Sequence, residues 1–187
     1  MVIPGLPIVA PDPLAVSLGG SETAGLQLAA ELVRQGHRVK VACSVAEPFE
    51  WRGVRLQGGF ADAELAEPCD LFLVQRDSGL LRYRGGARAA FLWLHDHQGS
   101  LGSGAADRYL FVSEWQAEQF RAQASSLAER FSVIRNGIDL DLIAEATAGV
   151  ERDPFRIAYI SRPERGLEVL LHAVLPRLLA EEPRARL

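Results

Sequence analysis

Cysteine is scarce in this chain of 187 residues. Cys43 and Cys69 are the only two, and neither has the close Cys or His spacing of a zinc site. Two isolated cysteines in a chain of this length do not indicate a disulfide framework either. We therefore expect a reducing, cytoplasmic setting and no bound metal.

Long apolar runs are missing as well. No stretch approaches the ~18 apolar residues of a membrane-spanning helix. The chain does not open with a charged segment followed by an apolar one, which is the pattern of a secretory leader. We expect neither feature, while peripheral membrane contact stays open.

An excess of basic residues is the third absence. The 24 acidic residues outnumber the 20 basic ones and give a net charge of −4, which argues against nucleic acid as a partner. An anionic ligand would therefore need a local site. Apolar residues make up 48% and charged residues 24%, as in soluble globular proteins, and the length suggests one domain plus a remainder.

Short apolar runs alternate with longer amphipathic ones along the chain. This alternation predicts an α/β fold, with a Rossmann-like parallel sheet and helices on both faces. The strands are expected at Leu6–Ala10, Arg38–Ala42, Leu71–Val74, Ala89–Leu94, Tyr109–Val112, Ser132–Ile134 and Arg156–Ile160. Residues 51–59 suggest a hairpin or an irregular excursion, and residues 62–68 suggest a helical turn or a loop.

Four helices are expected between these strands. The first begins at the N-cap Ser21 and closes at Gly36, the second begins after the cap Ser113, and the third begins at Asp139 or Asp141. The last runs over 166–180 with one apolar stripe, so it needs a hydrophobic partner. A boundary within 148–154 would divide the chain into a domain over 1–150 and a remainder over 151–187.

Unusual residues follow several strands, at the edge where parallel sheets bind ligands. Gly19 and Gly20 precede the first helix, where backbone N–H groups and the helix dipole attract phosphate, although two glycines can also serve only the turn. The pattern is not a dinucleotide fingerprint, because Glu22 stands where that motif needs glycine and Ser44 ends the second strand.

Two further groups of polar residues follow later strands. His95 and Asp96, with His97 beyond them, suit either a cleft that stabilises charge or a structural His–Asp pair. Arg162 and Arg165 suit either a diphosphate site or a solvated turn with a local ion pair.

Six segments in order resemble glycosyltransferase family 4 and together cover nearly the whole chain. They are Gly19–Glu22, Arg34–Val39, Leu94–Asp96, Val112–Trp115, Val133–Asp139 and Ile160–Glu168. The resemblance implies a GT-B architecture, in which an acceptor-side domain faces a donor-binding domain. It also implies transfer of a sugar, with retention at the anomeric carbon, from a nucleotide-sugar donor to a glycan, lipid or small-molecule acceptor, and no cofactor or metal.

The same resemblance assigns roles to particular residues. Gly19 and Gly20 would approach the donor phosphate and sugar, and His95 with Asp96 would line the transfer site. Arg162 and Arg165 would neutralise the diphosphate leaving group, although Arg165 stands where the family has lysine.

The family's second domain continues well beyond Leu187 and carries an acidic motif for the donor. We therefore expect the chain to be the N-terminal portion of such an enzyme, inactive alone and truncated after the first strand and helix of the second domain. The last helix would then pack on the first domain, associate with a second copy, or be poorly ordered. The alternatives are a non-catalytic glycan- or protein-binding module with the same fold, or a nicotinamide-dependent oxidoreductase.

Overall fold

The chain forms two compact units, Met1–Ile138 and Asp139–Leu187. The computed structural model describes residues 1–59, 67–96, 99–102 and 105–187. The expected boundary after residue 150 falls inside the second unit, and most of the expected turn or loop at 62–68 lies outside the described residues.

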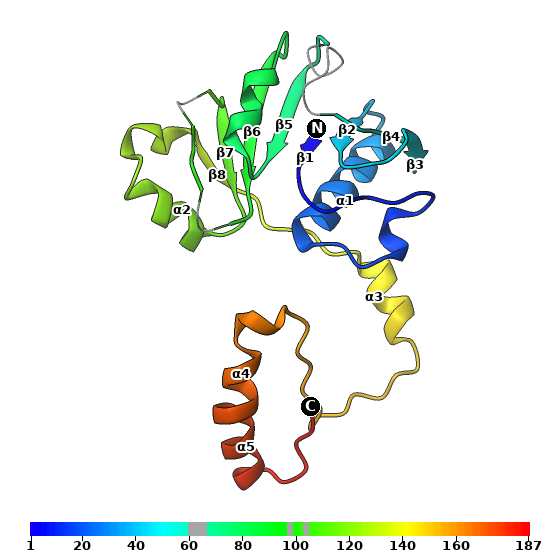
Figure 1. Ribbon diagram of the computed structural model, residues 1–187, viewed down its shortest axis with the longest axis vertical. Helices are drawn as coiled ribbons and strands as arrows, with labels where there is room; N and C mark the ends of the chain where they lie inside the picture. The colour runs from blue at the N-terminus through cyan, green and yellow to red at the C-terminus, as the bar shows by residue number, and fades with distance from the viewer. Residues whose placement is uncertain (60–66, 97–98, 103–104) are drawn as a thin grey trace. The chain divides into compact units, whose positions relative to one another are not determined.

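A single sheet organises the first unit. Within the described residues it has eight strands in the order β3-β4-β2-β1-β5-β6-β7-β8 (Figure 1). Each pair of neighbouring strands is parallel except the pair of β3 with β4, which is antiparallel. This order, with β1 in the middle, confirms the α/β class and is compatible with a Rossmann-like fold. The strands are β1 Val2–Ile3, β2 Lys40–Cys43, β3 Phe49–Trp51, β4 Val54–Gln57, β5 Leu71–Gln75, β6 Ala89–Leu94, β7 Arg108–Phe111 and β8 Phe131–Val133.

Two of the expected strands are wrong. The first strand is Val2–Ile3 and not Leu6–Ala10, because Pro7 has no N–H to donate to a ladder while Val2 and Ile3 are fully buried. The segment Arg156–Ile160 forms only an isolated bridge between Arg156 and Arg186. The other expected strands are confirmed with small shifts at their ends.

The hairpin suggested at 51–59 is present. Strands β3 and β4 pair antiparallel, and the two residues between them, Arg52 and Gly53, have φ angles of 50° and 75°. Two successive positive φ angles are typical of the tight turns that match the twist of a hairpin. Strand β4 also pairs with β2 in parallel, so the hairpin belongs to the main sheet.

Caps define the ends of the two long helices of this unit. The N-cap of α1 is Gly19 and not Ser21, which lies in the first turn. The backbone N–H of Gly36, at φ 92°, donates to the carbonyl of Val33, and the N–H of His37 donates to the carbonyl of Leu32. These two bonds form a Schellman motif, so α1 closes at Gly36 as expected. Ser113 caps α2 by accepting from the N–H of Gln116. The helical segments are η1 Pro13–Ala15, α1 Gly20–Arg34, η3 Ser78–Tyr83, α2 Glu114–Arg121 and η4 Ser125–Arg130.

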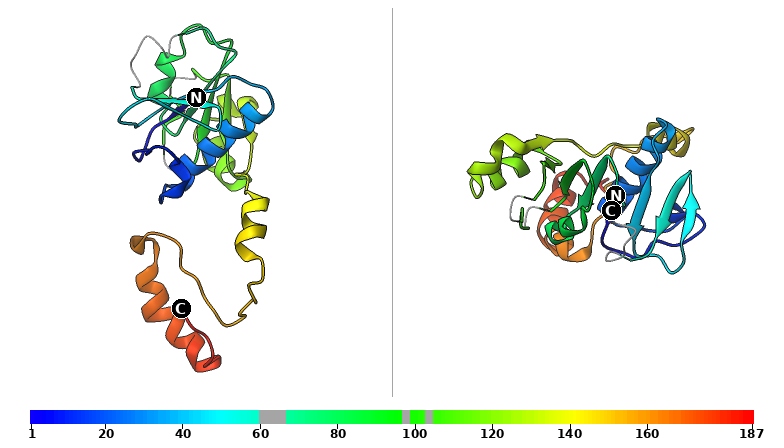
Figure 2. Two further views of the ribbon diagram at one scale, coloured as in Figure 1. Left: turned by 90° about the vertical axis from the view of Figure 1, so that its right-hand side faces the viewer. Right: turned by 90° about the horizontal axis from the view of Figure 1, so that it is seen from above.

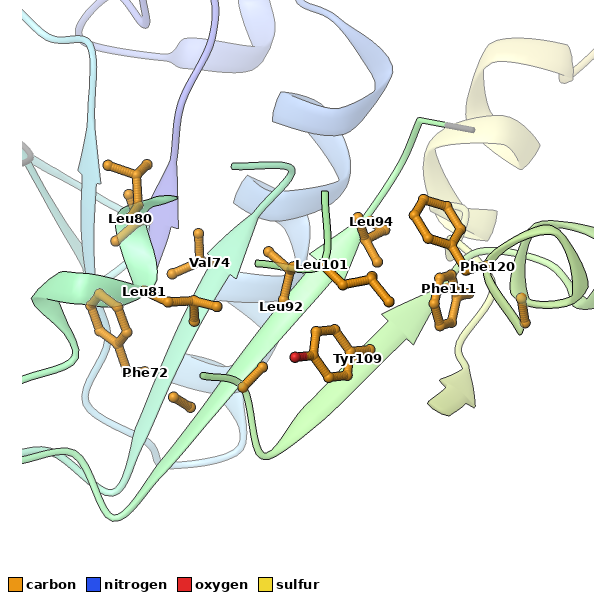
Figure 3. Packing of buried hydrophobic residues seen from close by; sticks show 14 of the residues in the cluster. Phe72, Val74, Leu80, Leu81, Leu92, Leu94, Leu101, Tyr109, Phe111 and Phe120 are labelled. Atoms are coloured by element: carbon orange, nitrogen blue, oxygen red, sulfur yellow. The ribbon is translucent and has the colours of Figure 1, made fainter. Parts of the chain in front are cut away.

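Helical segments cover both faces of the sheet. Adjacent residues of a strand point to opposite faces, so Leu73 and Val74 of β5 mark the two sides. Leu73 belongs to a cluster packed by Leu28 of α1. Val74 belongs to a larger cluster that includes Leu81 of η3 and Phe120 of α2 (Figure 3). The sheet is therefore the middle layer of the unit.

The second unit has little core of its own. It contains α3 Leu140–Thr147, capped by Asp139, and the short segment η5 Pro163–Arg165. After Gly166, at φ 103°, a continuous helix is formed by α4 Leu167–Val169, η6 Leu170–Val174 and α5 Leu175–Glu181. The backbone N–H of Arg186 donates to the carbonyl of Phe155, and the carbonyl of Arg186 accepts the N–H of Ile157, so the C-terminal residues run parallel to the segment that leads into the last helix (Figure 2). Ala185 is the only buried apolar residue of this unit, all of which the structure describes.

Candidate functional site

The candidate site lies where the direction of the sheet's connections reverses. The chain leaves β1 for β2 on one side, whereas β5 is followed by β6 on the other side. Crevices at the carboxyl ends of such neighbouring strands are the usual ligand sites of open parallel sheets. The loop after β1, the residues after β5 and β6, and the beginning of α1 contribute the polar groups described below.

Glu22 is the buried anion of this site. Its residue is 3% exposed, and its carboxylate accepts the N–H of Leu6 at 3.2 Å and the hydroxyl of Ser21 at 2.9 Å. Burial alone would raise its pKa, but hydrogen bonds from its own N–H, from Leu6 and from Ser21, together with the charge of Arg76, leave the pKa below its ordinary value. The carboxylate thus stays charged and already interacts with the positive end of the helix dipole.

Arg76 connects Glu22 to Asp96. Its Nε donates to Asp96 Oδ2 at 2.7 Å, and its Nη1 lies 3.9 Å from Glu22 Oε1. The backbone of Arg76 has φ 65°, an uncommon value for a residue with a side chain, and its N–H donates to the carbonyl of Trp93 at 2.9 Å. One guanidinium group thus faces two carboxylates, so Arg76 supplies no excess positive charge for a third anion.

His95 follows β6 and lies against Trp93 and Gln75. Its ring centroid is 4.5 Å from that of Trp93, and its Nε2 is 3.3 Å from the amide nitrogen of Gln75. Desolvation by burial lowers its pKa to about 4, opposed by Asp96 and Glu22 and assisted by Arg76. His95 is consequently neutral at physiological pH and suits hydrogen bonding better than charge pairing.

Gln116 attaches α2 to the same edge. The side chain is 3% exposed, its Nε2 donates to the carbonyl of Asp96 at 2.7 Å, and its Oε1 accepts the N–H of Val112 at 2.9 Å. Both ends of the amide are used, so Gln116 holds the loop after β6 against the end of β7. It fixes the backbone from which Asp96 projects.

The two glycines before α1 differ in what surrounds them. A Cβ atom on Gly19 would lie 2.2 Å from Glu22 Oε2, and one on Gly5 would lie 2.0 Å from Glu22 Oε1. A Cβ on Gly20 would meet nothing within 4 Å. Gly19 is therefore needed for the packing of Glu22, while Gly20 leaves the beginning of the helix open to an incoming group.

The structure brings only some of the predicted site residues together. His95 and Asp96 share the edge with Gly19 and Gly20, whereas Arg162 and Arg165 belong to the second unit. His97 lies outside the described residues. Arg162 lies 3.8 Å from Glu164 with both side chains about two-thirds exposed, which is the local ion pair considered as the alternative.

Sequence reasoning did not assign the glutamines and Arg76 to the site. Gln75 and Arg76 directly follow the predicted strand Leu71–Val74, and two polar residues after an apolar strand were the available signal. Gln116 gave no signal, because its role depends on reaching a carbonyl of another strand end.

The described residues 1–59, 67–96, 99–102 and 105–187 contain no group of three or more His, Cys, Asp or Glu side chains placed to hold a metal ion. Over the same residues, no helix is both long and apolar enough to cross a bilayer. In comparisons with known proteins, no family model matches the chain, and no curated protein matches it.

Proposed function

We propose that the chain is the N-terminal portion of a retaining glycosyltransferase of GT-B architecture. The first unit would bind the acceptor and one side of a nucleotide-sugar donor. The donor's diphosphate would be neutralised by Arg162 and Arg165 of the second unit. The proposal rests on one observation at the point where the strand order reverses. The first turn of α1, with open space at Gly20, lies at the same edge of the sheet as neutral His95 and charged Asp96.

The charges of the arginines support the assignment of diphosphate neutralisation to the second unit. Arg76 is engaged by Glu22 and Asp96, so this arginine is not free to neutralise a diphosphate. Arg162 is the N-cap of the short segment η5 and Arg165 is its last residue, and both residues are exposed. Guanidinium groups bind phosphate oxygens in a bidentate manner, which suits a leaving group that gains negative charge as its bond to the sugar breaks.

The proposed reaction balances without a protein base. The bond between the anomeric carbon and the phosphate oxygen breaks, and the acceptor oxygen forms the new bond on the same face. The acceptor proton passes to the departing phosphate. Neutral His95 donates a hydrogen bond in this scheme, and Asp96 remains paired with Arg76.

The test compares this chain with the product of the complete reading frame that contains it. Both are supplied with a panel of labelled nucleotide sugars and acceptors, and transfer and diphosphate release are measured. We expect turnover from the complete product and none from the 187 residues alone. Robust turnover by the 187-residue chain would overturn its assignment as an incomplete portion, and no sugar transfer by the complete product would overturn the transferase.

Substitutions locate the effect within the complete product. His95→Ala should lower turnover by about 10²-fold, as loss of a stabilising hydrogen-bond donor does, whereas His37→Ala, at an exposed position, should not. Arg162→Gln and Arg165→Gln should weaken nucleoside diphosphate binding, while Arg177→Gln on the exposed last helix serves as the matched control.

A second candidate function is a non-catalytic glycan-binding module. The pairing of Arg76 with Asp96 and Glu22 favours it, because one arginine beside two carboxylates leaves no excess positive charge, and such a site suits neutral hydroxyl-rich ligands better than anions. Glycan binding at the same site, without consumption of any nucleotide sugar, would select this function.

A further inference from the structure

Gln75 lies between the first helix and the ring of His95. The side chain is fully buried, and its Nε2 is 3.1 Å from the carbonyl oxygen of Ser21 and 3.3 Å from Nε2 of His95. One amide nitrogen therefore faces two different groups, and an amide nitrogen carries two hydrogens to donate.

The carbonyl of Ser21 fixes which end of the amide faces the ring. A carbonyl oxygen only accepts hydrogen bonds, so the NH₂ group of Gln75 must be the end that faces it. Rotating the amide by half a turn would place Oε1 against that carbonyl and lose the hydrogen bond. The same NH₂ group is then the neighbour of His95 Nε2, and this ring nitrogen must be the acceptor.

The packing around Gln75 leaves the amide little freedom. A Cβ atom on Gly25 of α1 would lie 2.7 Å from Gln75 Nε2 and 2.9 Å from Oε1, so the amide rests against a bare α-carbon. Among the described residues Oε1 has no hydrogen-bond partner. A buried polar atom without a partner is unfavourable, and here it accompanies the orientation that directs Nε2 at its two acceptors.

We propose that Gln75 is a positioning residue that holds His95 in the neutral tautomer with its proton on Nδ1. His95 then presents a hydrogen-bond donor to a ligand oxygen and is not a proton acceptor. In the described part of the chain no residue pairs with Nδ1, so that N–H remains for the ligand.

Two neighbouring features support this assignment. The contact with Trp93, at 4.5 Å between ring centroids, limits rotation of the imidazole away from Gln75. The low pKa of His95, caused first by burial, keeps the ring neutral, although Asp96 and Glu22 favour the charged ring and Arg76 opposes it. The identity of the ligand oxygen, an oxygen of the sugar or its phosphate, rests on the proposed function, whereas the tautomer does not.

The test is the tautomer of His95 in the 187-residue protein, observed by long-range proton–nitrogen correlation of ¹⁵N-labelled histidine at pH 7. The signals of His95 are assigned by their loss in His95→Gln. We expect one protonated nitrogen, Nδ1, and one unprotonated nitrogen, Nε2. A proton on Nε2, or a doubly protonated ring, would overturn the proposal, and this result needs no variant to fold beyond the one used for assignment.

Variants then test the role of Gln75. Gln75→Leu keeps the volume but removes the donor, so the Nδ1-protonated form should no longer dominate. Gln57→Leu, which removes another buried amide at the end of β4, should leave the ring signals unchanged. An unchanged tautomer in a folded Gln75→Leu protein would refute control by Gln75. The expected tautomer, together with no sugar transfer by the product of the complete reading frame, would refute the proposed function and leave this inference intact.

Discussion

Replacing Glu22 by Gln should destabilise the first unit by about 1–3 kcal/mol at neutral pH. The carboxylate accepts from the N–H of Leu6 and the hydroxyl of Ser21, and it faces Arg76 at 3.9 Å. A hydrogen bond to a charged acceptor contributes roughly 1.5–3 kcal/mol, compared with about 0.5–1.5 kcal/mol for a neutral one. Gln keeps one accepting oxygen but directs its NH₂ group at a donor or at a cation, and the expected loss follows from that difference.

The pH dependence of this destabilisation distinguishes the contribution of the charge of Glu22 from that of its shape. Its folded pKa lies below the ordinary value, so its charge stabilises the fold above the unfolded pKa of about 4.3. That stabilisation is lost as the pH falls through the folded pKa. The difference in free energy of unfolding between the wild type and Glu22→Gln should therefore be full at pH 7 and shrink below about pH 4.

Urea unfolding monitored by tryptophan fluorescence measures this difference. Trp51, Trp93 and Trp115 all belong to the first unit, so the signal reports its unfolding and not that of the second unit. The matched control is Glu50→Gln, because Glu50 is exposed on β3 and should change stability by less than about 0.5 kcal/mol. Equal midpoints for Glu22→Gln and the wild type, or a gap that stays constant with pH, would refute the reasoning.

Three other outcomes are expected. Gly19→Ala should lower the urea midpoint, because the new Cβ would lie 2.2 Å from the buried carboxylate of Glu22. Gly20→Ala should leave the midpoint unchanged or raise it, because its Cβ would meet nothing within 4 Å. Equal effects of the two substitutions would contradict this account. Asp96→Asn should lower the pKa of His95 below about 4 in an NMR titration, since Asp96 now raises it, and an upward shift would show that another group dominates. Burial raises the pKa of Cys43 to about 12, so at pH 8 it should react with a thiol reagent far more slowly than the chain's other, partly buried cysteine, and comparable rates would count against a closed core.

Elements with a strong local pattern could be predicted from the sequence. Strand β6 has the expected bounds, because an apolar run of this length that includes Phe91 and Trp93 is typical of a buried parallel strand. Ser113 caps α2 because a hydroxyl at that position reaches an N–H within the same turn. By contrast, the first strand is Val2–Ile3 and not 6–10. The apolar composition of 6–10 favours a strand, but Pro7 has no N–H for the sheet.

The candidate site was predictable only in outline. The sequence placed His95 and Asp96 at a strand end, but it did not reveal that Arg76 joins Asp96 to Glu22. Such a contact depends on which strands become neighbours, and β5 is next to β1 although the two are far apart in sequence. The role of Gln75 likewise depends on a helix carbonyl that no local pattern places near it.

The central position of β1 has a consequence for how the chain acquires its structure. Val2 pairs with Ala42 on one side and with Val74 on the other, so the central strand of the sheet is synthesised before the strands that pair with it on either side. The half that ends with the β3–β4 hairpin can form before β5 has been synthesised. Doubling the length of a loop adds only about 0.6 kcal/mol to the cost of closing it, so the long separation between β1 and β5 in the sequence costs their pairing little. The crevice at the switch point is then completed at the moment when the second half of the sheet docks on the first.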